Sequence, residues 1–187
     1  MHPNPDNSSF VEEIFAAFAA RGAERYGESV TQLEHALQCA EIAERDGAPP
    51  SLVAAALLHD YGHLVGEPGD PAQDRGEDAR HEVHGASVLA AWFPAEVRAP
   101  IALHVTAKRY LCTVDAAYEA ELSPASILSL RLQGGRLSPE ECRRFEAVRG
   151  FEDALRLRRY DDLAKVEGAP VPSLESFRPL LLSVAKA

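Results

Sequence analysis

The chain has 187 residues, of which 46% are hydrophobic and 26% are charged, the composition of a globular domain large enough to bury a core. Its 19 Lys and Arg residues stand against 29 Asp and Glu residues, so the formal net charge is −10 at pH 7. This acidic balance argues against nucleic acid and acidic membranes as partners, but it leaves open an anionic small molecule.

The sequence favours a cytoplasmic protein. No apolar stretch reaches the length of a membrane-spanning helix, and the N-terminal residues lack the basic and apolar runs of a secretory signal. The cysteines are odd in number, widely spaced and outside any CxxC pair. We therefore expect free, reduced thiols that fill the core, at Cys39, Cys112 and Cys142.

The N-terminal part of the chain predicts two amphipathic helices. We expect residues 1–8 to be disordered and a single domain to span residues 9–187. Each helix begins with a capping box, in which a Ser or Thr and a Glu three residues later satisfy the free amides of the first turn. The loop between the helices carries Tyr26 and Glu28, and His35 lies in the first turn of the second helix.

The stretch from Ala54 to His63 concentrates the polar chemistry. It begins inside an apolar run that predicts a buried helix from about Ser51, and it ends with His59, Asp60 and His63. On a continuous helix the two histidines share a face, and a glycine between them allows the backbone to leave the helix. Because burying these groups unpaired is costly, either a metal ion or a hydrogen-bonded His–Asp pair is expected here.

The rest of the chain predicts further helices. The loop at 65–80 is rich in Gly, Pro and Asp and has the length of a lid or binding loop. In the helix after it, Val83, Ala86, Leu89 and Trp92 are expected to face inward. Caps, prolines and periodicity predict the remaining helices at about 81–93, 94–111, 124–133, from 139, 151–165 and from 173. No run alternates convincingly with β-branched residues, so the predicted fold is all-α.

Six of the seven histidines fall between residues 35 and 104, on four predicted helices: His35, His59, His63, His81, His84 and His104. A helical bundle builds a metal site by converging side chains from several helices, and this pattern favours such a site over isolated core histidines. Ligation by nitrogen and oxygen without thiolate suits iron or manganese as well as zinc. His84 is expected either beside the ligands or exposed.

These motifs resemble the HD-domain superfamily, with its H…HD…D pattern, and in particular its oxygenase branch. That branch contains myo-inositol oxygenase and the organophosphonate-cleaving oxygenases, among them the groups acting on 2-amino-1-hydroxyethylphosphonate and on its trimethylated relative. The segments that carry the resemblance are Gln32–His35, Leu57–His63, His81–Ala86, His104–Tyr110, Leu132–Gly135 and Arg158–Lys165. The resemblance implies an HD-domain helical bundle with the metal site in its interior.

The resemblance implies a centre of two iron ions, Fe(II)/Fe(III), with O2 as co-substrate. Its metal ligands would be His35, His59, Asp60, His81, His104 and Asp161. Asp60 would bridge the two metals. Asp161 is preferred over Asp162 because the family spacing to Lys165 is four residues, which leaves Asp162 solvent-facing or beside the ligands.

Residues around these ligands predict how a substrate is held. Lys108 and Arg158 each stand one helical turn from a proposed ligand, which favours an anionic group such as a phosphonate, although both could be surface charges. Ser126, or Ser129 in its place, is a candidate contact for that group. The resemblance implies that His63 assists at the substrate.

The resemblance also implies a gating loop, in which Tyr26 caps a metal and Glu28 meets the substrate amine. The spacing of Tyr26 is one residue shorter than usual, so an ordinary surface tyrosine remains an alternative.

The expected reaction is cleavage of the C–P bond of a 1-hydroxy-2-aminoalkylphosphonate, or its N-methylated form, by O2 to phosphate and an amino acid. One rival is an HD-domain phosphohydrolase acting on a phosphate ester or nucleotide. The other is a metal-stabilised helical binding module without catalytic activity, in which the ligand set would be incomplete. The sequence leaves the oligomeric state and the nitrogen substituents of the substrate open.

Overall fold

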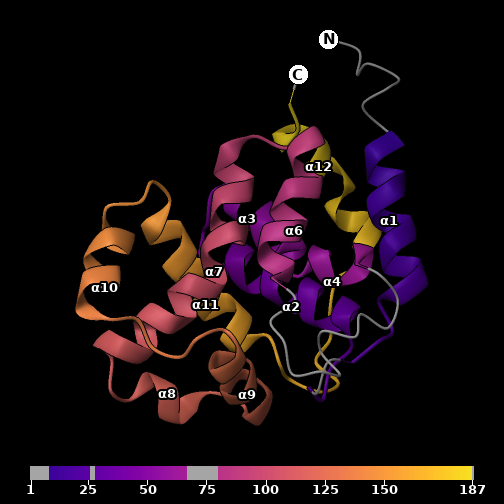
Figure 1. Ribbon diagram of the computed structural model, residues 1–187. Coiled ribbons are helices and arrows are strands. Elements are labelled where there is room, and N and C mark those ends of the chain that lie inside the picture. Colours follow the sequence, from indigo (N-terminus) through magenta and orange to yellow (C-terminus); the bar gives the residue numbers. More distant parts are fainter. Residues whose placement is uncertain (1–8, 26–27, 67–79, 187) are drawn as a thin grey trace.

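The computed structural model describes residues 9–25, 28–66 and 80–186, which form helices joined by loops, with no strand among them (Figure 1). The all-α prediction is confirmed. The disorder expected at 1–8, Tyr26 and most of the predicted lid at 65–80 lie outside the described residues. Within the described part of the chain, no helix is both long and apolar enough to cross a membrane.

The helices lie in this order: α1 (Ser9–Arg21), α2 (Gln32–Arg45), α3 (Pro50–Leu58), α4 (Tyr61–Val65), α6 (His81–Val88), η2 (Leu89–Ala91), α7 (Ala95–Val114), α8 (Tyr118–Glu121), α9 (Pro124–Leu132), α10 (Pro139–Glu146), α11 (Phe151–Leu163), η3 (Leu174–Phe177) and α12 (Arg178–Val184). The capping boxes predicted at Thr31 and Ser138 are both formed. The short helix α8 has no counterpart in the sequence-based prediction.

Helix α3 lies at the centre of the molecule, and every side chain from Leu52 to Leu58 is buried. It contacts α2, α7, α11 and α12, and α1 closes the same core from one side (Figure 1). A helix surrounded on all faces must be apolar on all faces, which explains its uninterrupted apolar sequence. The core therefore holds the C-terminal end of α3, where the polar residues begin, in a fixed position.

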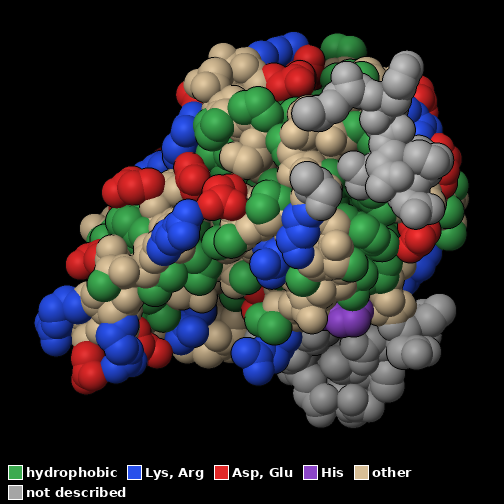
Figure 2. Space-filling view, turned by 90° about the horizontal axis from the view of Figure 1, so that it is seen from above, with side chains coloured by type: hydrophobic (Ala, Val, Ile, Leu, Met, Phe, Trp, Pro, Cys, Tyr) green, Lys and Arg blue, Asp and Glu red, His purple; other side chains and the backbone are tan. Residues whose placement is uncertain are grey.

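A smaller group of helices, α8, α9 and α10, lies on the side of α7 and α11 that is away from α1 (Figure 1). Two small apolar clusters join it to α7, and they contain Cys112 and Cys142. These two cysteines and Cys39 are free and buried, as predicted. On the face shown in Figure 2, basic and acidic side chains are interspersed, so no single acidic patch accounts for the net charge there.

The helix break in the central motif differs from the prediction. Helix α3 ends at Leu58 and α4 begins at Tyr61, so the chain turns at His59 and Asp60 and not at Gly62. Gly62 has another role: a Cβ atom added there would lie 2.0 Å from the carbonyl oxygen of His81. The missing side chain lets α4 and α6 touch, a tertiary constraint that the local sequence does not reveal.

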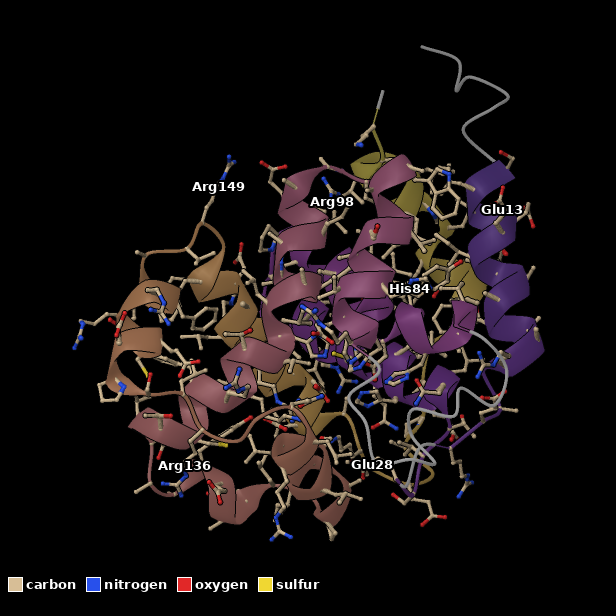
Figure 3. The ribbon with its side chains drawn as sticks, viewed as in Figure 1. Glu13, Glu28, His84, Arg98, Arg136 and Arg149 are labelled. Carbon is tan, nitrogen blue, oxygen red and sulfur yellow. The ribbon has the colours of Figure 1, made fainter. Side chains whose placement is uncertain are left out.

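The inward face predicted for the helix after residue 80 is wrong at Val83, which is 43% exposed. Gly85 packs against Gly62: a Cβ atom added at Gly85 would lie 2.8 Å from the backbone nitrogen of Gly62. This close contact sets the buried face of α6. Glu82 consequently faces inward and Val83 is exposed. His84, which is labelled in Figure 3, is exposed as well. Regular α-helix also ends earlier than predicted, at Val88, where the 3₁₀ turn η2 follows.

Candidate metal centre and substrate cavity

Six polar side chains, from four helices and the turn between α3 and α4, meet inside the bundle, where Figure 3 shows nitrogen and oxygen atoms gathered between α2, α6, α7 and α11. They are His35 on α2, His59 after α3, Asp60 before α4, His81 at the start of α6, His104 within α7 and Asp161 in the last turn of α11. The structure thus brings together all six residues predicted as metal ligands.

Asp60 joins two pairs of histidines through its two carboxylate oxygens. Its Oδ2 lies 3.5 Å from Nε2 of His59 and 3.8 Å from Nε2 of His35. Its Oδ1 lies 3.3 Å from Nε2 of His81 and 3.7 Å from Nε2 of His104. These atoms form two groups that could each hold a metal ion, with Asp60 common to both. This is the geometry expected of a bridging carboxylate.

Asp161 adds a second carboxylate to one of these groups. Its Oδ1 lies 3.3 Å from Nε2 of His35. Asp162 instead forms an ion pair with Arg158 and accepts a hydrogen bond from the hydroxyl of Tyr118. The geometry therefore agrees with choosing Asp161 over Asp162 as the candidate ligand.

The backbone fixes which nitrogen of three histidines faces the centre. Nδ1 of His35, His59 and His104 lies 2.8, 2.9 and 2.7 Å from the carbonyl oxygens of Ala164, Ala56 and Ile101, respectively. A carbonyl oxygen only accepts hydrogen bonds, so each Nδ1 donates its proton and the neutral ring directs a lone pair from Nε2 to the centre. Because these Nε2 lone pairs face the centre, the residues present are suited to binding metal ions.

The electrostatics also favour cations. Burial acts to raise the pKa of Asp60, but the electrostatic influence of the neighbouring imidazoles of His59 and His81, with a hydrogen bond from His81, outweighs it and holds that pKa well below its usual range. Burial opposes ionisation of Asp161 as well, and the charges of Arg158 and Lys165 lower its pKa. Two ionised carboxylates among imidazoles form a hard donor set, suited to iron, manganese or zinc.

A cavity of about 160 Å³ opens beside this cluster. Five of the six candidate metal ligands line it, all except His59, and so do Glu28 and Ala125. Its lining includes the cations Lys108, Arg158 and Lys165, which stand out in a chain of net charge −10. Such a cavity is suited to a small anion that approaches the metal centre.

The predicted serine contacts both line this cavity. Nζ of Lys108 donates a hydrogen bond of 2.7 Å to Oγ of Ser129, and Nζ of Lys165 donates one of 3.0 Å to Oγ of Ser126. Ser126 and Ser129 are one turn apart on α9, so this helix presents two hydroxyls to the cavity. The structure supports both residues as candidates.

His63 lines the cavity and stacks on the candidate ligand His81, with ring centroids 4.0 Å apart and planes inclined by 18°. Burial, with the charge of His81, lowers the pKa of His63 to about 3, so its imidazole is neutral. A neutral imidazole can donate one hydrogen bond and accept another at a substrate. His84, by contrast, is exposed on α6, away from this cluster (Figure 3).

Arg158 is buried and makes more contacts within the protein than the sequence suggested. It is 3% exposed, its Nη1 lies 2.6 Å from Oδ2 of Asp161, and it also pairs with Asp162. Its Nε donates a hydrogen bond of 2.9 Å to the hydroxyl of Tyr118. Its charge is therefore shared with two carboxylates, and it orients the candidate ligand Asp161.

Lys165 and Gln133 are among the cavity residues to which the sequence analysis gave no role. Lys165 served only to fix the spacing from Asp161; helix α11 ends at Leu163, so Lys165 lines the cavity from the segment that follows the helix. Gln133 lines the cavity with a buried Oε1 that has no hydrogen-bond partner among the described residues. The sequence feature that could have identified Gln133 as a site residue is its place in the segment Leu132–Gly135.

The fold and this cluster define a helical protein with a candidate metal centre in its interior. Residues 32–133 match the HD domain family. The chain is 46% identical over 168 residues to hydroxymethylphosphonate dioxygenase of Gimesia maris, a match that covers 89% of this chain and 84% of that protein. It is 41% identical over 177 residues to [1-hydroxy-2-(trimethylamino)ethyl]phosphonate dioxygenase (glycine-betaine-forming) of Leisingera caerulea, covering 94% and 90%.

The chain therefore belongs to the HD-domain family, in the branch that contains these two dioxygenases. An uncharacterized protein of Acanthamoeba polyphaga mimivirus is 36% identical over 178 residues, covering 94% of this chain and 80% of that protein. The predicted family and its oxygenase branch are confirmed, and the chain is a metal-binding enzyme of this branch. The individual ligand and substrate roles stay predictions.

Proposed function

We propose that this protein uses O2 to cleave the C–P bond of a 1-hydroxyalkylphosphonate, releasing phosphate and a carboxylic acid. The relatives' names support this reaction, since both describe dioxygenases of phosphonates with a hydroxyl on the carbon bonded to phosphorus. The reaction balances: O2 accepts four electrons, one oxygen atom enters the phosphate and the other enters the carboxylate. A substrate with a 2-amino group, or its N-methylated form, yields an amino acid.

The observation that carries the proposal is the placement of Asp60 between two histidine pairs at the end of a cavity lined by cations. We propose that these six side chains hold two iron ions, Fe(II)/Fe(III), which activate O2 and anchor the substrate when bound. An anion beside such a centre needs positive charge, and Lys108 and Arg158 supply it. Ser126 completes the contacts to the phosphonate.

The remaining residues orient the substrate. His63, which lines the cavity and stacks on His81, is the candidate residue that assists at the substrate. Glu28 lines the cavity and is the candidate partner of a substrate ammonium. Tyr26 is proposed to cover the centre, as the family resemblance implies. We further propose one domain over residues 9–187 and action in the cytoplasm, consistent with free buried thiols.

The hydrolytic alternative receives no support from the relatives, whose names describe oxygenases. The complete set of six candidate ligands also argues against a binding module without activity.

The experiment is reconstitution of the purified protein with iron under anaerobic conditions, followed by assays of phosphate release with and without O2. Hydroxymethylphosphonate and 2-amino-1-hydroxyethylphosphonate are the test substrates, and a simple phosphate ester is the control. Phosphate from a hydroxyphosphonate only in the presence of O2 supports the proposal. Rapid anaerobic hydrolysis of the ester, with no oxygen-dependent product, would mean that the protein is a phosphohydrolase and not an oxygenase.

A further inference from the structure

The carboxylate of Glu28 already has two partners. Its Oε1 accepts a hydrogen bond of 2.7 Å from Oγ of Ser123 and one of 3.0 Å from Nζ of Lys165. Figure 3 shows Glu28 at the foot of the bundle, beside α9, whose N-cap is Ser123. The side chain is 23% exposed, so the pair is partly shielded from water and weakly screened.

The ammonium of Lys165 connects Glu28 to the metal centre. Besides its contact with Glu28, Nζ donates to Oγ of Ser126 and lies 3.8 Å from Oδ1 of Asp161. Three acceptors from three parts of the chain therefore hold this ammonium within the substrate cavity. A lysine is ordinarily charged at neutral pH, and the carboxylates of Glu28 and Asp161 beside this one favour the charged form.

This arrangement creates a competition for Glu28. The carboxylates that line the cavity among the described residues are Glu28, Asp60 and Asp161, and the latter two are candidate metal ligands. A substrate ammonium must therefore pair with Glu28, where it meets the ammonium of Lys165. Lys165 is covalently part of the site and competes at a high effective concentration.

We propose that Lys165 is a specificity-determining residue, which holds Glu28 as its counter-ion and so sets how strongly the cavity prefers ammonium-bearing or uncharged 1-hydroxyphosphonates. A substrate with an ammonium has to displace Lys165 from Glu28, whereas an uncharged substrate leaves the pair intact. This inference rests on the proposed function and concerns the choice among its substrates.

The inference predicts a change in a ratio of rates. The two probes are 2-amino-1-hydroxyethylphosphonate and 1-hydroxypropylphosphonate, in which a methyl group replaces the ammonium. Lys165→Met keeps the length of the side chain and removes its charge, so kcat/KM for the amino compound relative to the propyl compound should rise about tenfold or more. Lys165→Arg keeps a counter-ion and should leave the ratio within about twofold of wild type.

The second part of the experiment asks whether the gain depends on Glu28. Glu28→Gln in the Lys165→Met background should abolish the gain, and its effect on the ratio should be larger there than in wild type. Because the two probes share the same metal centre, a general loss of activity cancels in the ratio. If Lys165→Met retains too little iron to turn over, Lys165→Gln and anaerobic binding of both phosphonates to the iron-loaded protein give the same ratio as dissociation constants.

An unchanged ratio in Lys165→Met, or an equal effect of Glu28→Gln in both backgrounds, overturns the inference while leaving the oxygenase function in place. Failure of wild type to release phosphate from either probe with O2 would instead overturn the proposed function. The binding ratio, measured without O2, still decides the role of Lys165 in that case.

Discussion

His35 and His59 present their Nε2 atoms to each other at a distance of 3.1 Å, while each ring gives its Nδ1 proton to a backbone carbonyl. A proton or a metal ion between the two Nε2 atoms binds both nitrogens, and the nearby carboxylates of Asp60 and Asp161 favour such a cation. His81 and His104 also bring their Nε2 atoms together, at 3.2 Å. Metal binding at these nitrogens displaces protons and adds its free energy to folding, which couples metal affinity to stability.

Metal removal should therefore destabilise the protein. We expect about two metal ions per chain, and a fall in Tm on treatment with a chelator, because ligand binding at 1,000 times Kd stabilises by about 4 kcal/mol per site. Asp60→Ala should lose metal and thermal stability together, since Asp60 faces all four histidines.

Metal analysis and thermal unfolding measured on the same samples check this expectation. Glu140→Gln, at a carboxylate that is 71% exposed, is the control and should change neither quantity. Unchanged metal content and Tm in Asp60→Ala would remove Asp60 from the ligand set.

The contact between Gly62 and the backbone of His81 predicts a second effect. Ala at position 62 would place its Cβ 2.0 Å from the carbonyl oxygen of His81, and backbone cannot yield as a flexible side chain does. We expect a loss of about 3 kcal/mol or more in unfolding free energy, together with lower metal content, because α4 and α6 must separate at a ligand.

Gly47→Ala is the matched control, since a Cβ there meets nothing within 4 Å and the cost comes from its positive φ of 66°. It should cost about 1–2 kcal/mol and leave the metal content unchanged. Denaturant unfolding and metal analysis distinguish the two variants, and equal metal content in both would mean that the Gly62 contact does not position His81.

Local signals predicted much of this fold, and long-range contacts explain what they missed. The capping boxes at Thr31 and Ser138 are short-range hydrogen bonds and were therefore readable from sequence. The true role of Gly62 depends on a residue from another helix, and so does the outward direction of Val83. No periodicity within one segment carries that information.

The same limit applies to the site. The histidine spacing and the HD motif led to six residues that the structure brings together. The pair of Lys165 and Glu28 joins positions 137 residues apart, and the sharing of Arg158 between two carboxylates depends on rotamers that sequence does not give.

Substitutions of Arg158 and Lys108 should have different effects, although the sequence analysis predicts the same role for both residues. Arg158 holds the candidate ligand Asp161 through a contact of 2.6 Å, whereas Lys108 contacts Ser129 among the described residues. Arg158→Ala removes a counter-ion from buried Asp161 and from partly buried Asp162, so it should lower both metal content and stability, the latter by about 3–5 kcal/mol. Lys108→Ala should keep the metals and weaken phosphonate binding by about 10- to 100-fold.

Metal analysis and anaerobic titration with hydroxymethylphosphonate, run on both variants, test this difference. Arg156→Ala, at an arginine that pairs with Asp46 outside the cavity, is the control for loss of a guanidinium and should change neither quantity. If Arg158→Ala retained full metal content and lost only phosphonate affinity, Arg158 would be a substrate contact alone, as the sequence first suggested.

The pKa of Lys108 predicts how phosphonate binding depends on pH. Burial and the nearby charge of Arg158 lower this pKa to about 8, so the ammonium is present below that pH and lost as the pH rises through it. Across about pH 7 to 9.5 an ordinary lysine would stay charged, and Lys108 would not. Affinity for hydroxymethylphosphonate should accordingly fall about tenfold above pH 8, as a charged hydrogen bond becomes a neutral one.

Anaerobic titrations of the iron-loaded protein over this range measure the effect, and Lys108→Arg supplies the comparison. A guanidinium stays charged at every pH used, so the affinity of this variant should hold level where that of wild type declines. An identical decline in both proteins would mean that another group, and not Lys108, loses the proton that controls binding. A decline confined to wild type would identify Lys108 as the cation that faces the phosphonate.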